Sequence, residues 1–155
     1  MRNLYFVITQ SILACTCLYL SSCTAGSCFD ETESRVKGTF YSTETGKALA
    51  PDSVTLFGVT MDTLEIYDKK TNLQSAELPL YAAEQVCKFV IRINGINDTL
   101  EFRYSNYPHL LSKECGYTFF FTLDTVINSV NIIDSISIQK NTITTFNEEN
   151  LRIFY

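Results

Sequence analysis

The residue with the clearest chemical context in this sequence is Cys23. It follows Leu20-Ser21-Ser22, which is one branched apolar residue and two small residues directly before a cysteine. This order is typical of the bacterial lipobox, in which the thiol receives a diacylglycerol group and a peptidase cuts just before the cysteine. Small side chains let the peptidase close around an extended backbone. We therefore expect Cys23 to be a site of lipid attachment.

The segment before the lipobox is typical of an export signal. Met1-Arg2-Asn3 is a short basic lead, and a largely apolar stretch runs from Leu4 to Leu20. This stretch falls short of the ~20 apolar residues that a membrane helix needs. Cleavage before Cys15 would leave an unusually short apolar region, and cleavage before Cys28 would lie too far beyond it. Residues 1–22 are therefore predicted to be a lipoprotein signal peptide.

Three cysteines of the predicted mature chain remain after lipid attachment, namely Cys28, Cys87 and Cys115. In an oxidising compartment three thiols permit one disulfide bond. We favour a bond between Cys28 and Cys115, because it would hold the N-terminal segment against the fold. Closing so long a loop contributes at most about 4 to 5 kcal/mol in the chain-entropy model. Cys87 would then be a small core residue. A bond between Cys87 and Cys115 is the alternative.

Residue types that support catalysis or metal binding are sparse. His109 is the only histidine, and it lies in Asn106-Tyr107-Pro108-His109, which is typical of a loop. A Ser or Cys nucleophile needs a base nearby, and a zinc site needs several nitrogen or sulfur ligands. Carboxylate pairs such as Asp30-Glu31 and Glu148-Glu149 occur in polar stretches, where solvated charge is the common reason for them. We expect no enzymatic activity, no metal and no cofactor.

Composition and charge favour a globular protein and argue against nucleic acid as a partner. The chain has 155 residues, of which 46% are hydrophobic and 13% aromatic, enough for one domain with its own core. It carries 12 basic and 17 acidic residues, and the basic ones are scattered singly apart from Lys69-Lys70. A protein that binds a nucleic acid duplex needs a clustered basic face.

The mature chain divides into a short tether and one β domain. Residues 23–34 are predicted to form the lipidated tether, whose residues are small, polar or acidic. Residues 35–155 are predicted to form the domain. From Arg35 onward apolar residues alternate with period two in short runs between turn formers. This pattern predicts an all-β fold, an antiparallel two-layer β-sandwich of immunoglobulin-like type with about 7–8 strands. A small barrel is the structural alternative. The expected strands cover residues 35–41, 53–59, 76–80, 86–93, 99–104, 116–123, 132–139 and 151–155.

The clearest unit is a predicted β-hairpin formed by residues 86–93 and 99–104 around a connection that contains Gly95. Alternation places seven of its residues toward the core: Cys87, Phe89, Ile91, Ile93, Leu100, Phe102 and Tyr104. The following strand presents Tyr117, Phe119, Phe121 and Leu123 on one face. Pro79 suits an edge strand, because proline cannot donate a backbone hydrogen bond.

Four segments of the mature chain carry a resemblance to a known family: Cys28-Phe29-Asp30-Glu31, Asp98-Thr99-Leu100-Glu101-Phe102, Ser112-Lys113-Glu114-Cys115-Gly116-Tyr117 and Leu151-Arg152-Ile153-Phe154-Tyr155. In them the chain resembles the small uncharacterised lipoproteins of Bacteroidota, over nearly all of the mature chain. The resemblance implies a lipid-anchored, envelope-facing β domain with cysteines that match Cys28 and Cys115. It implies no activity, and Cys87 does not match the shared pattern.

These observations lead to two hypotheses for function. The first is an interaction module that is anchored by lipid in the outer membrane, on its periplasmic face or at the cell surface, and docks on an outer-membrane or periplasmic protein. The acidic residues that would favour surface export begin only at Asp30, so both faces stay open. The second is a lipoprotein that binds a surface glycan or small ligand, with Tyr104, Tyr107 and His109 as a stacking patch.

Replacement of Cys23 tests the predicted anchor. The Cys23→Ala variant should incorporate no palmitate in growing cells, because the acceptor thiol is gone. Metabolic labelling followed by gel autoradiography measures this directly. Palmitate labelling that persists in the variant would contradict the anchor.

Overall fold

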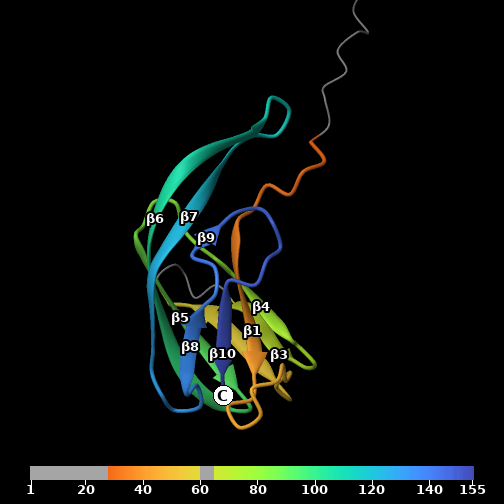
Figure 1. The fold of residues 1–155 in the computed structure, drawn as a ribbon, viewed down its shortest axis with the longest axis vertical. Coiled ribbons are helices and arrows are strands. Elements are labelled where there is room, and N and C mark those ends of the chain that lie inside the picture. Colours follow the sequence, from red (N-terminus) through yellow and green to blue (C-terminus); the bar gives the residue numbers. More distant parts are fainter. Residues whose placement is uncertain (1–27, 60–64) are drawn as a thin grey trace, which may run out of the picture.

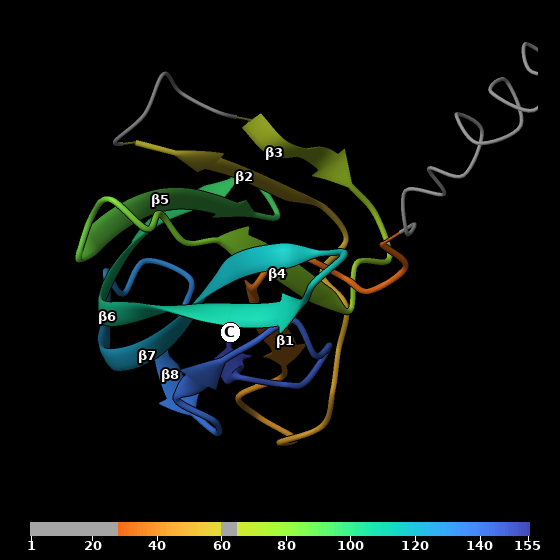
Figure 2. The same ribbon diagram turned by 90° about the horizontal axis from the view of Figure 1, so that it is seen from above.

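The computed structural model describes residues 28–59 and 65–155 and has a two-layer all-β architecture. The predicted signal peptide (residues 1–22) and Cys23 lie outside the described residues. Within the described ranges the chain forms ten strands and no helix, arranged as two facing sheets (Figures 1 and 2). The predicted all-β sandwich is therefore confirmed. No helix among these residues is long and apolar enough to cross a membrane.

The two sheets differ in size. The smaller has four strands in the order β4-β1-β10-β8, with β1 at Arg35–Tyr41, β4 at Ser75–Pro79, β8 at Ser135–Ile138 and β10 at Leu151–Phe154. The larger has six strands in the order β3-β2-β5-β6-β7-β9, with β2 at Val54–Gly58, β3 at Glu65–Lys70, β5 at Val86–Ile93, β6 at Ile96–Ser112, β7 at Gly116–Asn128 and β9 at Thr142–Ile143.

Pairing is antiparallel except in the centre of the smaller sheet. There β1 and β10 run parallel, with Gly38 opposite Leu151 and Tyr41 opposite Phe154. The first and last strands of the domain are thus hydrogen-bonded neighbours. β4 lies at one edge of this sheet, which is the position that its Pro79 favours.

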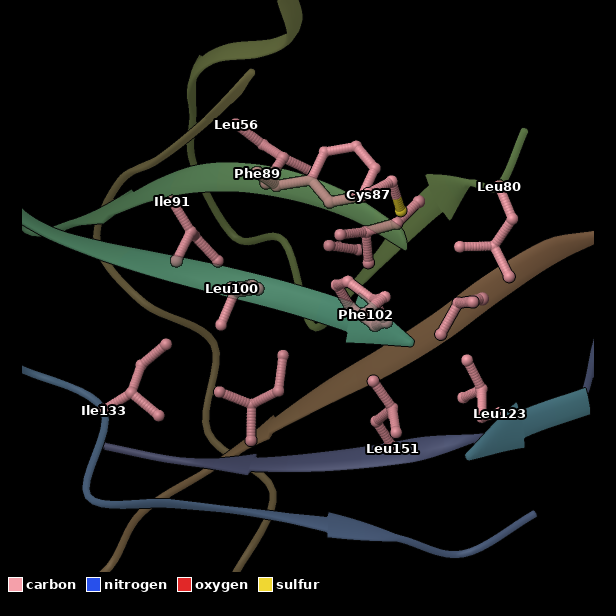
Figure 3. Close-up of a cluster of buried hydrophobic side chains, with 14 of the residues drawn as sticks. Leu56, Leu80, Cys87, Phe89, Ile91, Leu100, Phe102, Leu123, Ile133 and Leu151 are labelled. Carbon is pink, nitrogen blue, oxygen red and sulfur yellow. The ribbon is translucent and has the colours of Figure 1, made fainter. Parts of the chain in front are cut away.

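The core lies between the facing sheets. All seven residues that the hairpin alternation assigns to it are buried, so that prediction is confirmed. Phe89 and Phe102 pack edge to face, with ring centroids 5.6 Å apart, and Leu151 of the other sheet belongs to the same cluster (Figure 3). Edge-to-face aromatic pairs of this kind add stability beyond the area that they bury.

The turn between β5 and β6 is tighter than predicted. The strands are joined by Asn94 and Gly95 alone, with φ of 49° and 89°. Positive φ at both positions is the requirement of a type I′ turn, which matches the twist of the flanking strands and favours Asn-Gly. Residues 96–98, expected in the connection, therefore belong to β6.

The strand β6 also runs well beyond its predicted end at Tyr104. It continues to Ser112 and pairs throughout with β7, so Asn106-Tyr107-Pro108-His109 is strand and the expected loop is wrong. The two strands curve past the sandwich as one long hairpin (Figure 1). Toward its turn no described strand faces them, which is why Tyr117 and Phe119 are 73% and 41% exposed although they share one face with the buried Phe121 and Leu123.

A buried carboxylate holds the segment after β7 against the start of β6. Asp98 is 1% exposed, and its side chain accepts hydrogen bonds from the hydroxyl of Ser129 and from the backbone N–H groups of residues 131, 132 and 133. Burial raises the pKa of Asp98, but these four donors outweigh it and hold the pKa below the usual range. The charged form is therefore favoured in the folded protein.

The Asp98→Ala variant should lose about 2–4 kcal/mol of unfolding free energy at pH 7, because the backbone N–H groups of residues 131, 132 and 133 lose their acceptor and that of Ile133 is buried. Since the folded pKa is lowered, this stabilisation is present at neutral pH and disappears as the pH falls from about 4 through the folded pKa. Urea titrations at several pH values measure both effects. Asp124 is exposed on β7, and Asp124→Ala, the matched control, should change stability by less than about 0.5 kcal/mol. Equal stability of the two variants at pH 7 would contradict the assigned role.

Candidate functional site

The N-terminal tether is fastened to the turn of the β6–β7 hairpin. Cys28 and Cys115 form a disulfide bond, which is the pairing that the sequence analysis favours, and their Cα atoms are 4.8 Å apart. Further along, the hydroxyl of Thr118 donates a 2.6 Å hydrogen bond to the carbonyl oxygen of Thr32. The described part of the tether therefore follows the β7 side of the hairpin.

A cleft of about 530 Å³ opens where this tether, the hairpin and the ends of the sheets meet. The cleft is bounded by residues 32–35, the start of β3, the residues that follow β4, and the first half of β7. Its apolar wall consists of Ile66, Pro79, Leu80, Phe119 and Phe121, and its polar rim of Glu33, Arg35 and Glu65. A mostly apolar hollow of this size with a few polar groups is a typical binding site.

The loop that contributes Leu80 and Ala82 to the cleft is held by the base of the hairpin. The Tyr104 hydroxyl accepts a hydrogen bond from the Tyr81 backbone N–H (3.1 Å) and donates one to the Tyr81 carbonyl oxygen (3.0 Å). The Asn106 side-chain amide donates to the Ala82 carbonyl oxygen at 3.0 Å. Three hydrogen bonds thus fix this wall of the cleft against β6.

Burial keeps the two titratable groups beside this wall uncharged. It raises the pKa of Tyr104 to about 12 and that of Cys87 to about 12. Cys87 is a buried free thiol. Because the thiolate is the nucleophile, a cysteine with so high a pKa is unreactive near neutral pH. The thiol therefore serves packing rather than chemistry.

The polar rim is partly neutralised. Arg35 donates from Nε to the Glu33 carboxylate at 3.0 Å, and both side chains are substantially exposed. The hydroxyl of Ser34 is buried and has no hydrogen-bond partner among the described residues. Buried polar atoms are nearly always paired, so this hydroxyl is an exception in the fold.

The aromatic patch expected for a glycan does not form. Tyr104 is buried in the core, whereas Tyr107 and His109 are exposed further along β6. The His109 ring stacks on Phe120 with centroids 4.2 Å apart, and Tyr107 packs edge to face on the same ring. Tyr107 and His109 therefore cover one face of the hairpin, and Tyr104 does not join them.

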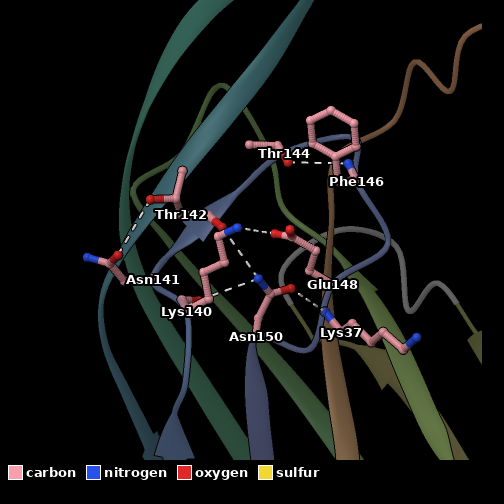
Figure 4. A network of polar contacts seen from close by, with 8 residues as sticks. All are labelled: Lys37, Lys140, Asn141, Thr142, Thr144, Phe146, Glu148 and Asn150. Carbon is pink, nitrogen blue, oxygen red and sulfur yellow. Dashed lines mark hydrogen bonds and ion pairs between the residues drawn. The ribbon is translucent and has the colours of Figure 1, made fainter.

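A second hollow, of about 350 Å³, is lined mainly by charged and polar residue types and lies beside the segment 144–147. The adjoining network centres on Asn150, whose side chain accepts from the backbone N–H of Lys37 at 2.9 Å and donates to the carbonyl oxygens of Lys140 and Thr142 (Figure 4). Lys140 forms an ion pair with Glu148. These contacts tie β1, β9 and β10 together, so the network is structural.

The described residues hold no group of three or more His, Cys, Asp or Glu side chains that could bind a metal ion. Sequence reasoning missed the cleft, because its wall combines Ile66, Leu80 and Phe119, which come from three distant segments. Of these residues, Phe119 could have been noticed in the sequence, since it belongs to the alternating apolar series of β7. Its exposure depends on the length of the opposite sheet, which local alternation does not encode.

The Tyr104→Phe variant should loosen the wall of the cleft, because two hydrogen bonds to Tyr81 are lost while the ring remains. We expect a loss of about 1–2 kcal/mol in unfolding free energy and faster hydrogen exchange at the Tyr81 amide. Denaturant titration and exchange followed by NMR measure these. Tyr117→Phe, at an exposed position, is the control and should change neither. Unchanged Tyr81 exchange in Tyr104→Phe would contradict the assigned contact.

Comparison with known proteins places the chain in a family without assigning an activity. Neither a search of curated proteins nor one of solved structures returned a significant match. The model of a family of unknown function, DUF6452, matches residues 53–155. The matched range contains Cys115 and the whole apolar wall, whereas the tether and β1 precede it. Since the match covers about two thirds of the sequence, the chain belongs to the family of unknown function DUF6452.

Proposed function

We propose that this protein is a lipid-anchored binding module of the cell envelope, whose cleft holds an apolar segment of an outer-membrane or periplasmic protein. Cys23 carries the lipid in this proposal, and residues 1–22 are the signal peptide that directs export. The lipobox Leu20-Ser21-Ser22-Cys23 supports the anchor. The resemblance to small lipoproteins of Bacteroidota supports an envelope location, on the periplasmic face of the outer membrane or at the cell surface.

The observation that carries the proposal is the position of the cleft beside the fastened tether. Residues 32–35 form one side of the cleft, and the Cys28–Cys115 bond fixes the chain just before them. The start of the described chain, at Cys28, and the cleft therefore lie toward the same end of the domain. A module arranged in this way presents its binding site to proteins in or next to the membrane that holds the anchor.

The chemistry of the cleft suits an apolar segment of a protein. Phe119 is 41% exposed, and such a large aromatic side chain beside a hollow gains stability when a partner covers it. The rim charges of Glu33 and Glu65 surround this wall and would contact polar atoms at the edge of an interface. Protein interfaces commonly combine an apolar centre with a polar rim.

Mild-detergent purification of the tagged mature protein from native membranes tests the proposal. The wild-type protein should recover one defined envelope protein in a fixed ratio. Phe119→Ser should recover at least about ten-fold less of this partner, which corresponds to a loss of about 1.4 kcal/mol in binding free energy. Val130→Ser is the control, because Val130 is 75% exposed but lies in the loop after β7, away from the cleft. It should retain the partner at the wild-type ratio.

Two results would contradict this function. One is recovery of the protein as a lone monomer after crosslinking in intact cells. The other is equal recovery of the partner by Phe119→Ser and by wild type. Thermal unfolding of each variant establishes that it is folded, because a partner lost through unfolding would not bear on the cleft.

The size of the cleft favours a second candidate function, which is the binding of a small ligand. Its volume of about 530 Å³ lies within the range of small-molecule sites, about 300–1,000 Å³. The predominance of Ile66, Leu80 and Phe119 in the wall points to a ligand with an apolar body. Native mass spectrometry of the purified protein separates the candidates, since a small ligand adds a constant mass that Phe119→Ser removes.

A further inference from the structure

The end of the β6–β7 hairpin carries apolar side chains that the fold leaves uncovered. Leu110 and Tyr117 are opposite each other in the β6–β7 register and are 49% and 73% exposed. Phe29, which is 92% exposed, directly follows Cys28 and so has its Cα within about 9 Å of that of Cys115. The name hairpin end denotes these three residues. They lie at the opposite pole of the domain from its C-terminus (Figure 1).

The length of chain before the disulfide limits how far the hairpin end can be from a lipid on Cys23. Five residue steps separate Cys23 from Cys28, and a fully extended chain spans at most about 18 Å over five steps. The Cys28–Cys115 bond extends this distance limit to the hairpin turn, since the Cα atoms of the two cysteines are 4.8 Å apart. The hairpin turn therefore lies no more than about 23 Å from the lipid-bearing residue.

We infer that the hairpin end is a second membrane contact, which places Phe29, Leu110 and Tyr117 among the headgroups of a zwitterionic phospholipid surface. This inference rests on the lipid anchor at Cys23 proposed above. It goes further, because the anchor alone leaves the orientation of the domain free. A lipid plus three inserted side chains fixes the hairpin toward the membrane, so that the cleft opens close to the membrane plane.

The side chains have the chemistry that this position requires. Tyrosine is enriched at the membrane interface, where its ring meets the acyl boundary and its hydroxyl stays among the headgroups. Leucine and phenylalanine gain from burial in the boundary region. Nearby charges are mainly acidic, with Asp30, Glu31 and Glu114 against Lys113. Attraction to anionic lipid therefore cannot supply the contact, and the apolar side chains must.

Tryptophan fluorescence tests the inference, because the sequence contains no tryptophan. Tyr117→Trp introduces one probe at the hairpin end, and Leu110→Trp introduces it on the partner strand. Each mature, acylated protein is purified from membranes and reconstituted into phosphatidylcholine vesicles, with or without brominated acyl chains. Val130→Trp provides the control probe, because Val130 is 75% exposed and belongs to the loop between β7 and β8, which lies at the same pole as the C-terminus (Figure 1).

We expect Tyr117→Trp and Leu110→Trp to lose most of their iodide quenching on reconstitution and to be quenched by brominated lipid. Val130→Trp should remain fully open to iodide and unaffected by bromine. Replacing part of the phosphatidylcholine with phosphatidylglycerol should give no gain in bromine quenching. These results would support contact between the hairpin end and zwitterionic lipid.

Three results would overturn the inference. Probes that stay as open to iodide as Val130→Trp would place the hairpin end in water. Probes protected from iodide but not quenched by brominated lipid would place it against a second copy of this chain. Bromine quenching that requires phosphatidylglycerol would contradict the charge argument.

Mass spectrometry of the N-terminal peptide separates this inference from the proposed function. An acylated Cys23 with exposed probes contradicts the hairpin contact alone and leaves the anchored binding module intact. A Cys23 without acyl chains overturns the anchor and the inference together. Recovery of the partner protein tests the cleft independently of the membrane contact, because Phe119 is not part of the hairpin end.

Discussion

The covalent bond between Cys28 and Cys115 is the constraint on which the functional end of this molecule depends. It joins the N-terminal tether to the turn of a hairpin that reaches beyond the sandwich. In the chain-entropy model a link across 87 residues contributes about 4 to 5 kcal/mol. Its structural effect is more specific, because it holds the segment that leads into residues 32–35, one side of the cleft, against the hairpin turn.

The unequal size of the two sheets explains why there is a cleft and an exposed hairpin end. The long strands β6 and β7 extend beyond the short strands of the four-stranded sheet. The apolar face of the hairpin therefore has no opposite strand to pack against near its turn, among the described residues. Phe121 is buried, Phe119 is partly exposed and Tyr117 is mostly exposed, in the order in which they approach the turn. The same alternation that builds the core thus leaves apolar side chains exposed near the turn.

Local pattern was enough to predict the hairpin core, because period two and burial coincide where both sheets are present. All of the residues assigned to the core from β5 and the first half of β6 are buried, among them Phe89 and Tyr104. The extension of β6 through Pro108 was not predictable in this way, since its pairing with β7 overrides the turn propensity of the local residues. The parallel β1–β10 pair likewise depends on contacts between the two ends of the domain. The cleft was missed for the same reason, as its residues come from separate segments that only the fold brings together.

Peptide mapping of the mature protein under non-reducing conditions, after blocking of free thiols, tests the central constraint most directly. The account predicts one cross-linked peptide pair containing Cys28 and Cys115, with Cys87 recovered as the free thiol. Recovery of a peptide in which Cys28 is a free thiol, or of Cys87 bonded to Cys115, would contradict it. In either case the position of the hairpin end next to the proposed anchor would not be fixed.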